Sequence, residues 1–428
     1  MSINLRLRLS AMMFLQYVIW GAWAPVLTAY LQQKLGFTGF ELGMTMALLP
    51  LACIVSPFIG GQLADRYMPT QRFLALAHLL GGASLFMLAG QHSFLPFGIW
   101  MFVYALLYAP TLPLTNSLAF HHLRNAERDF GWIRVFGTLG WIASGLALTL
   151  CRSGAKGVSV LGLRLALPGP LLHLYQSSTA AASDSLVLAG AASILLAVFC
   201  LFLPHTPPSK SENPLAFLKA LSLLKDRNFA VFMAISFIVV TELQFYYVLT
   251  APFLQYIGVS SRTLPTVMTI AQWGEIIGMA VLLPFLLPRL GIRKCLAIGV
   301  IAWPLRYAIF AIGQPVGLVE ASLSLHGLGY TFFFVVGQVY VNSVATSDIR
   351  ASAQSLLTLI TLGLGNFLGA LFAGWVQDQF TTGTGATASV YYTGVFLVPC
   401  ALTVICAIAF LLFFKDTKAE VAEVAGGG

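Results

Sequence analysis

Twelve apolar stretches of about twenty residues recur along the chain, and they constrain its fold more than any other feature. Because a helix needs about 20 apolar residues to cross the hydrocarbon core of a bilayer, each stretch is long enough for one membrane-spanning helix. The strands of a membrane β-barrel would be about 10 residues long and would alternate in polarity, which these runs do not. The predicted spans are residues 10–34, 40–63, 73–90, 94–118, 132–151, 185–204, 228–250, 264–287, 294–313, 317–343, 351–376 and 389–414.

The amino-acid composition agrees with a chain that lives in a lipid bilayer. Of its 428 residues, 58% are hydrophobic and only 9% are charged, whereas about 25% are charged in a soluble globular protein. So few charged residues cannot form the water-exposed surface of a soluble protein of this size. This composition excludes a soluble enzyme and a disordered scaffold. The net charge of +8 is scattered over loops rather than gathered in a patch, so we expect no nucleic-acid partner.

The chain divides into two halves of similar size around a polar, basic segment at 205–227. Each half holds six predicted spans, which suggests an internal repeat. The sequence therefore predicts an all-α membrane protein with twelve transmembrane helices in two pseudo-symmetric halves. These are a six-helix bundle at 1–204, a cytoplasmic linker at 205–227 and a second six-helix bundle at 228–428.

The distribution of basic residues predicts the orientation of the chain. Sixteen of the 23 lysines and arginines lie on the side that holds both termini, and two, Arg134 and Arg306, lie inside predicted helices. Five lie on the opposite side: Lys34, Arg152, Lys156, Arg164 and Arg262. The positive-inside rule places both termini in the cytoplasm. We expect a multi-pass protein of the inner (plasma) membrane, with the long loop 152–184 outside.

Polar side chains inside the predicted spans are the candidate functional residues, since each costs free energy in hydrocarbon unless it is paired or lines a cavity. Gln272 and Glu275 share one helix face with Thr269, so a carboxylate and an amide point the same way. Glu242 and Gln244 are two residues apart and cannot share a face. The two carboxylates, Glu242 and Glu275, are the candidate proton carriers. The alternative for Thr269, Gln272 and Glu275 is a polar clamp between helices, and of Glu242 and Gln244 one is expected to face the cavity while the other packs in the bundle.

Two further spans carry candidate residues at helical spacing. Arg134, Thr138 and Trp141 lie at positions i, i+4 and i+7 of one helix, and His326 and Tyr330 at i and i+4 of another. A histidine in such a place can carry a proton or hydrogen-bond a substrate. The structural alternatives are an arginine that anchors in the headgroups and a buried, satisfied histidine.

Arg306 is the other cation inside a span, and the sequence favours a structural role for it, with Glu320 as a partner carboxylate. No glycine-rich phosphate loop, metal-ligand spacing or nucleophile motif occurs in the sequence. We therefore expect no enzyme, no ATP-driven pump, no metal and no cofactor. Transport driven by an ion gradient is the class that remains.

Several short strings carry a family resemblance. Residues 61–66, Gly-Gln-Leu-Ala-Asp-Arg, follow the second span, as in the major facilitator superfamily. Seven more strings lie in family order from the first span to the eleventh: 14–23, 110–114, 134–140, 242–244, 272–275, 302–306 and 350–354. With them the chain resembles the nucleoside:proton symporter family of that superfamily.

The resemblance implies a central nucleoside site and import by proton symport with alternating access. The positions that match the family's binding residues are Arg134, Thr138, Gln244, Gln272 and Glu275. Four more occupy binding positions but differ in residue type from the family: Trp141, Tyr247, His326 and Tyr330.

Thr331 stands where the resemblance implies a carboxylate associated with proton coupling. Coupling would then fall to Glu275 or Glu242, and a nucleoside uniporter is the alternative mechanism. A major facilitator transporter of another small polar solute, such as a sugar, is the alternative substrate class, and a membrane receptor or enzyme is a different class altogether. We expect the protein to work as a monomer with a nucleoside and a proton as its partners.

Overall fold

The structure is a computed structural model that describes residues 3–123, 126–153, 158–160, 163–165, 183–207, 217–346, 349–383 and 387–415. Most of the predicted external loop 152–184 and the middle of the predicted linker 205–227 lie outside the described residues. For the motif at 61–66, the structure describes the helical backbone but not the side chains.

Ten helical stretches in the described part of the chain are long and apolar enough to cross a membrane. One of them, Leu264–Ile312, is two spans, because Gly291 turns the backbone with φ 74° and ψ 172°. A shorter apolar helix, Asp184–Cys200, completes the set of twelve. The prediction of an all-α membrane protein with twelve transmembrane helices in two six-helix halves is confirmed.

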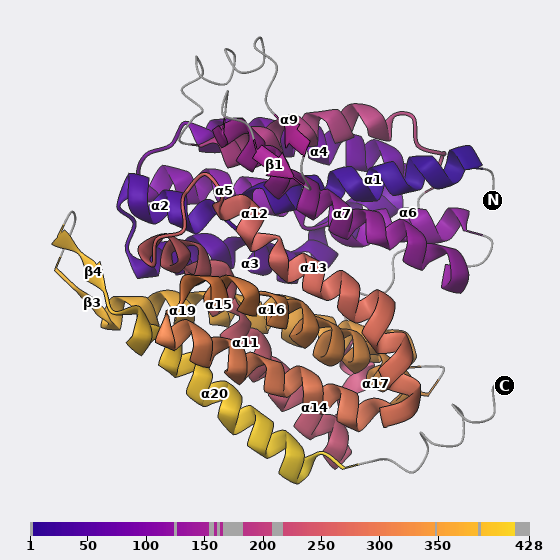
Figure 1. The fold of residues 1–428 in the computed structure, drawn as a ribbon. Helices are drawn as coiled ribbons and strands as arrows, with labels where there is room; N and C mark the ends of the chain where they lie inside the picture. Colours follow the sequence, from indigo (N-terminus) through magenta and orange to yellow (C-terminus); the bar gives the residue numbers. More distant parts are fainter. Residues whose placement is uncertain are drawn as a thin grey trace. The chain divides into compact units, whose positions relative to one another are not determined.

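Contacts between residues divide the chain into two units, and unit 1 consists of Met1–Glu212 and Ala251–Thr269 (Figure 1). Its helices are α1 (Ile3–Trp23), α2 (Leu27–Leu35), α3 (Gly39–Tyr67), α4 (Thr70–Ala89), α5 (Phe94–Tyr108), α6 (Thr111–His122), α7 (Ala126–Ser153), α9 (Asp184–Cys200) and α12 (Leu264–Met268). The short strands β1 (Val158–Val160) and β2 (Leu163–Leu165) pair antiparallel. The break between α5 and α6 falls at Pro110, as the prolines of that span predict.

Unit 2 consists of Asn213–Thr250 and Ile270–Gly428. Its helical segments are α10 (Phe217–Ala220), η3 (Leu221–Lys225), α11 (Arg227–Tyr256, whose end belongs to unit 1), α13 (Ile270–Ile277), η4 (Gly278–Leu282), α14 (Leu283–Ile312), α15 (Val316–Ser322), α16 (Ser324–Gly329), η5 (Tyr330–Val335), α17 (Val336–Val344), α18 (Arg350–Thr358), η6 (Leu359–Gly365), α19 (Asn366–Gln379) and α20 (Tyr392–Phe413). The two-residue strands β3 (Thr381–Thr382) and β4 (Ser389–Val390) pair antiparallel. Three segments, η4, η5 and η6, are π-helical, a geometry that is frequent at functional sites.

Glycines allow α1 and α7 of unit 1 to pack closely. A Cβ atom on Gly140 would collide with the backbone carbonyl oxygen of Phe14, and one on Gly137 would lie 2.7 Å from the ring of Tyr17. Small residues at a helix contact let two backbones approach in a membrane, where the hydrophobic effect does not drive helices together. Gly137 and Gly140 therefore let α7 approach α1 closely.

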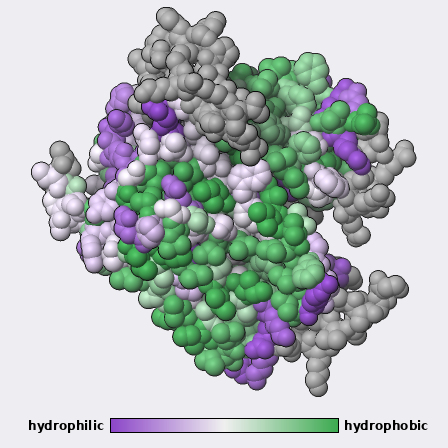
Figure 2. Space-filling model, in the orientation of Figure 1, coloured by the Kyte–Doolittle hydropathy of each residue, from purple (hydrophilic) through white to green (hydrophobic). Residues whose placement is uncertain are grey.

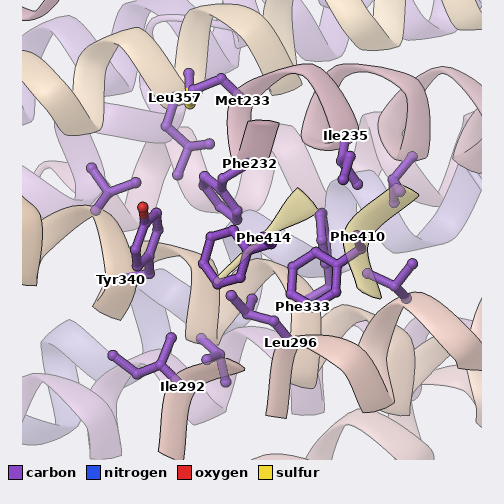
Figure 3. Close-up of a cluster of buried hydrophobic side chains, with 14 of the residues drawn as sticks. Phe232, Met233, Ile235, Ile292, Leu296, Phe333, Tyr340, Leu357, Phe410 and Phe414 are labelled. Carbon is purple, nitrogen blue, oxygen red and sulfur yellow. The ribbon is translucent and has the colours of Figure 1, made fainter. Parts of the chain in front are cut away.

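Large apolar side chains fill the interior of unit 2 and cover its outside. In the core, Phe232 of α11 packs near Phe333 of η5 and Tyr340 of α17 (Figure 3). On the face shown in Figure 2, hydrophobic side chains cover α14 and α20. The exposed hydrophobic residues of these two helices include Leu305 and Ile405. An apolar outer surface is what a helix needs where it faces lipid.

Candidate functional site

In unit 1, the predicted residues of α7 lie beside the aromatic residues of α1. Thr138 and Trp141 are buried, and Arg134 is half-buried. The indole of Trp141 meets that of Trp20 edge-on, with ring centres 5.5 Å apart. The guanidinium carbon of Arg134 lies 4.3 Å from the centre of the Tyr17 ring. The structure therefore brings Arg134 and Trp141 against aromatic residues of α1.

In unit 2, glycines bring two of the predicted segments together. A Cβ atom on Gly327 of α16 would collide with the backbone nitrogen of Glu275 and the backbone oxygen of Ala271 in α13. A Cβ atom on Gly274 would lie 2.5 Å from the backbone oxygen of Ser324. Because the two backbones touch here, Gln272 and Glu275 on α13 are held close to the segment that carries His326.

Gln272 presents an acceptor that the described protein does not use. Its side chain is buried, and its carbonyl oxygen Oε1 has no hydrogen-bond partner. Glu275, three residues later on α13, is half-buried. Thr331 is buried and turns its hydroxyl toward the backbone oxygen of Glu275, 3.4 Å away. The residue that replaces the expected carboxylate is therefore a neutral group beside Glu275.

Gln244 of α11 is engaged by a residue that sequence reasoning missed. Its amide nitrogen Nε2 donates to Oδ1 of Asn366 over 2.7 Å. Asn366 begins α19 directly after the π-helical segment η6. The feature of the sequence that could have identified Asn366 is an asparagine inside an apolar span, close to the glycines at 363 and 365.

His326 is buried within a group of aromatic rings. Its imidazole stacks on Tyr246 with ring centres 3.9 Å apart, and it meets Tyr247 edge-on at 5.9 Å. Tyr247 and Tyr330 are half-buried, and Tyr330 is the first residue of η5. The predicted residues Tyr247 and His326 therefore lie side by side, although they come from different helices.

Arg306 of α14 pairs with His326 and not with Glu320, so the partner suggested by the sequence is wrong. Its Nη1 lies 2.8 Å from Nδ1 of His326, and no residue in the described part of the chain hydrogen-bonds to its Nε or Nη2. The turn at Gly313 ends α14, and His326 lies beyond the following helix α15, on α16. Sequence spacing alone does not reveal which residue faces Arg306 across that turn.

Glu242 is fully buried in the same part of unit 2. Neither carboxyl oxygen has a hydrogen-bond partner among the described residues, while its backbone oxygen accepts a 2.7 Å hydrogen bond from the hydroxyl of Tyr307. The charge of Arg306 acts on this carboxyl group. The structure thus places a carboxyl group, a guanidinium and an imidazole within one apolar and aromatic region.

A cavity of about 430 Å³ lies in unit 1, away from the predicted binding residues, none of which lines it. Its lining includes Lys34, Arg152, Gln255 and Arg262. Arg152 donates twice to the carboxylate of Asp184, over 2.7 Å each, and once to the backbone oxygen of Ser261 over 2.8 Å. Sequence reasoning assigned no chemistry to Arg152. Among the described residues, no group of three or more His, Cys, Asp and Glu side chains is arranged to hold a metal ion.

Comparisons with known proteins place this geometry in a family. The chain matches the family described as "Nucleoside H+ symporter" over residues 1–419. It is 34% identical to YegT of Escherichia coli (strain K12), with 97% of this chain and 95% of that protein covered. It is 30% identical to the nucleoside permease NupG of the same organism, with 96% of each chain covered. The crystal structure of NupG superposes with a TM-score of 0.80 at 27% identity, over 97% of this chain and 100% of that chain.

These matches span nearly the whole of both chains, so they concern the entire transporter and not one segment of it. The predicted major facilitator fold and the predicted class, a proton-coupled nucleoside importer that is not an enzyme, are confirmed. The chain belongs to the nucleoside:H+ symporter family.

Proposed function

We propose that the transported nucleoside is held by the nine predicted residues of the two units. From unit 1 they are Arg134, Thr138 and Trp141. From unit 2 they are Gln244, Tyr247, Gln272, Glu275, His326 and Tyr330. Amide and carboxylate groups suit the hydroxyls of the ribose and the edge of the base, and aromatic rings suit its flat face.

The observation that carries this proposal is the unused oxygen of Gln272. A buried acceptor without a partner costs free energy, so its presence on a membrane helix needs a reason. It lies one helical turn from Glu275 and close to the segment of His326, because α13 and α16 touch at Gly274 and Gly327. A ribose hydroxyl or an amino group of a base would donate to this oxygen.

The coupling proton is carried by Glu242 or Glu275. In support, Thr331 has no titrating group, and these two carboxyl groups lie on the helices that carry Gln244 and Gln272. A carboxyl group inside a transporter that alternately takes up and releases a proton links the proton gradient to the movement of substrate.

The test is uptake of labelled uridine into proteoliposomes, with and without an inward proton gradient. We expect the wild-type protein to accumulate uridine only with the gradient. If Glu242 carries the proton, Glu242→Gln should abolish accumulation while leaving uridine counterflow, which needs no net proton movement. If Glu275 carries it, Glu275→Gln should abolish accumulation and also weaken counterflow, because Glu275 is one of the proposed binding residues. Glu320→Gln, a half-buried carboxyl group on α15, is the matched control and should behave as wild type.

Three outcomes would change the proposal. If both variants keep gradient-driven accumulation, neither residue carries the proton. If uridine uptake by the wild-type protein is the same with and without the proton gradient, the protein is a uniporter. If excess unlabelled uridine, adenosine and inosine fail to compete while sugars do, the substrate class is wrong.

We further propose that the chain works as a monomer in the inner membrane with both termini in the cytoplasm. The excess of Lys and Arg on the side of the termini supports this orientation.

A further inference from the structure

The contact between Arg306 and His326 joins the two most deeply buried basic side chains of unit 2. Nη1 of Arg306 lies 2.8 Å from Nδ1 of His326, which is a short hydrogen bond between nitrogens. A guanidinium group has five N–H donors, no acceptor, and stays protonated in proteins. The imidazole must therefore supply the lone pair, so Nδ1 carries no proton.

This single contact determines the state of the whole ring. A neutral imidazole whose Nδ1 is an acceptor carries its proton on Nε2. A doubly protonated ring would lose the hydrogen bond and would place two positive groups 2.8 Å apart. His326 thus offers one N–H donor at Nε2, and Nε2 makes no hydrogen bond to any described residue.

The surroundings hold both side chains in place. The guanidinium carbon of Arg306 lies 4.4 Å from the ring centre of Tyr307, 4.9 Å from that of Trp303 and 5.2 Å from that of Tyr246. Cations are stabilised at such distances from aromatic faces. The imidazole stacks on the ring of Tyr246, with ring centres 3.9 Å apart, and meets the ring of Trp303 edge-on at 5.7 Å. Neither side chain can turn away without losing these contacts.

We infer that Arg306 is a positioning residue that fixes His326 as the Nε2–H tautomer, so that His326 donates a hydrogen bond to an acceptor atom of the nucleoside. The inference rests on the proposed role of His326 in binding. The acceptor is a carbonyl oxygen or ring nitrogen of the base, or an oxygen of the ribose. Fixing His326 as the Nε2–H tautomer also excludes this residue as a carrier of the coupling proton. The ionisable groups in this part of unit 2 are Glu242, Tyr246, Tyr247, Glu275, Arg306, Tyr307 and Tyr330.

The tautomer can be measured directly. We would record solid-state ¹⁵N NMR spectra of the wild-type protein in liposomes, with the histidine rings labelled, and assign His326 by its loss in His326→Gln. We expect an unprotonated Nδ1 and a protonated Nε2. In Arg306→Met the same ring should show a mixture of tautomers. A protonated Nδ1 in the wild-type protein would overturn the inference, and this result does not depend on transport.

A double-mutant cycle then connects the tautomer with binding. Arg306→Met should raise the KM for uridine about tenfold, and Arg306→Lys, which keeps a donor, should recover most of it. In the His326→Gln background, Arg306→Met should have no further effect on KM, because there is no imidazole to orient. A purely structural Arg306 would raise KM equally in both backgrounds, which would contradict the inference.

The control is Arg289→Met on the same helix α14. Arg289 is bonded to the backbone oxygen of Phe285 and is not part of the aromatic group, so its loss should leave KM unchanged. If wild-type protein shows no nucleoside uptake at all, the proposed function fails, and the NMR spectrum alone decides the state of His326.

Discussion

At the scale of single residues, the two glutamines predicted to bind substrate differ in how their side chains are used. Gln244 is bonded to Asn366, whereas the oxygen of Gln272 has no partner in the described protein. The side-chain amide of Gln244 can therefore offer the substrate only the donor and acceptor positions that its hydrogen bond with Asn366 leaves free. Gln272 offers its acceptor at no cost in broken hydrogen bonds, and it should be the more important of the two for affinity.

We therefore expect Gln272→Leu to raise the KM for uridine by about tenfold to a hundredfold, since a lost hydrogen bond that leaves a substrate group unpaired costs about 1–3 kcal/mol. Initial rates of uptake into proteoliposomes measure this. Gln338→Leu is the control, because Gln338 on α17 is exposed and its substitution should leave KM as it is. An unchanged KM in Gln272→Leu would remove Gln272 from the binding site.

The sequence predicts which residues are unusual but not how they pair. Spacing on one helix groups Gln272 with Glu275, and Arg134 with Trp141. The partner of Arg306 was mistaken, because a pairing across two helices depends on their relative rotation and height, which sequence spacing does not contain. Asn366 was missed for the same reason, because its role depends on the hydrogen bond that it accepts from Gln244 on another helix.

At the scale of the helical element, the contact of α13 with α16 holds the predicted residues of unit 2. The apolar runs predict both spans, and the interior of each contains glycine. Which glycines touch the neighbouring backbone depends on packing. Gly274 and Gly327 do so, whereas Gly317 on α15 has open space where its Cβ would be.

Gly327→Ala should lower the free energy of unfolding by about 1–3 kcal/mol, the usual cost of overpacking, because its Cβ would collide with the α13 backbone. It should also impair uridine binding, since α13 would shift. Gly317→Ala should be neutral or slightly stabilising, as alanine favours a helix. Thermal unfolding in detergent compares the two variants. Equal stabilities would show that the close approach at Gly327 is not needed.

At the scale of the whole molecule, membrane orientation is the property that residue chemistry predicts without any packing information. It depends only on which loops carry Lys and Arg. In the orientation that we propose from the charge distribution, Lys34 and Arg262, which line the cavity of unit 1, lie on the outer side of the membrane.

Cysteine labelling in whole cells tests this orientation. In a background from which the six native cysteines are removed, Lys34→Cys and Arg262→Cys should react with a membrane-impermeant maleimide. Arg72→Cys and Lys225→Cys, which are also exposed, should react only after the cells are opened. The reverse pattern would invert the topology. As a control, all four introduced cysteines should be labelled in opened cells, which shows that each position is accessible to the reagent.

The course of the backbone between the units has a mechanical consequence. The chain enters unit 1 at Ala251 and returns to unit 2 at Ile270. Pro252, inside α11, lacks the N–H that would complete the helix there, and α12 ends at Met268 before α13 begins. A helix that lacks a backbone hydrogen bond, or that is interrupted, bends at a lower cost in free energy than a continuous helix. These are two of the three places where the chain crosses between the units. Because the backbone can bend there at low cost, a conformational change during transport can be taken up at these crossings without displacing the proposed binding side chains.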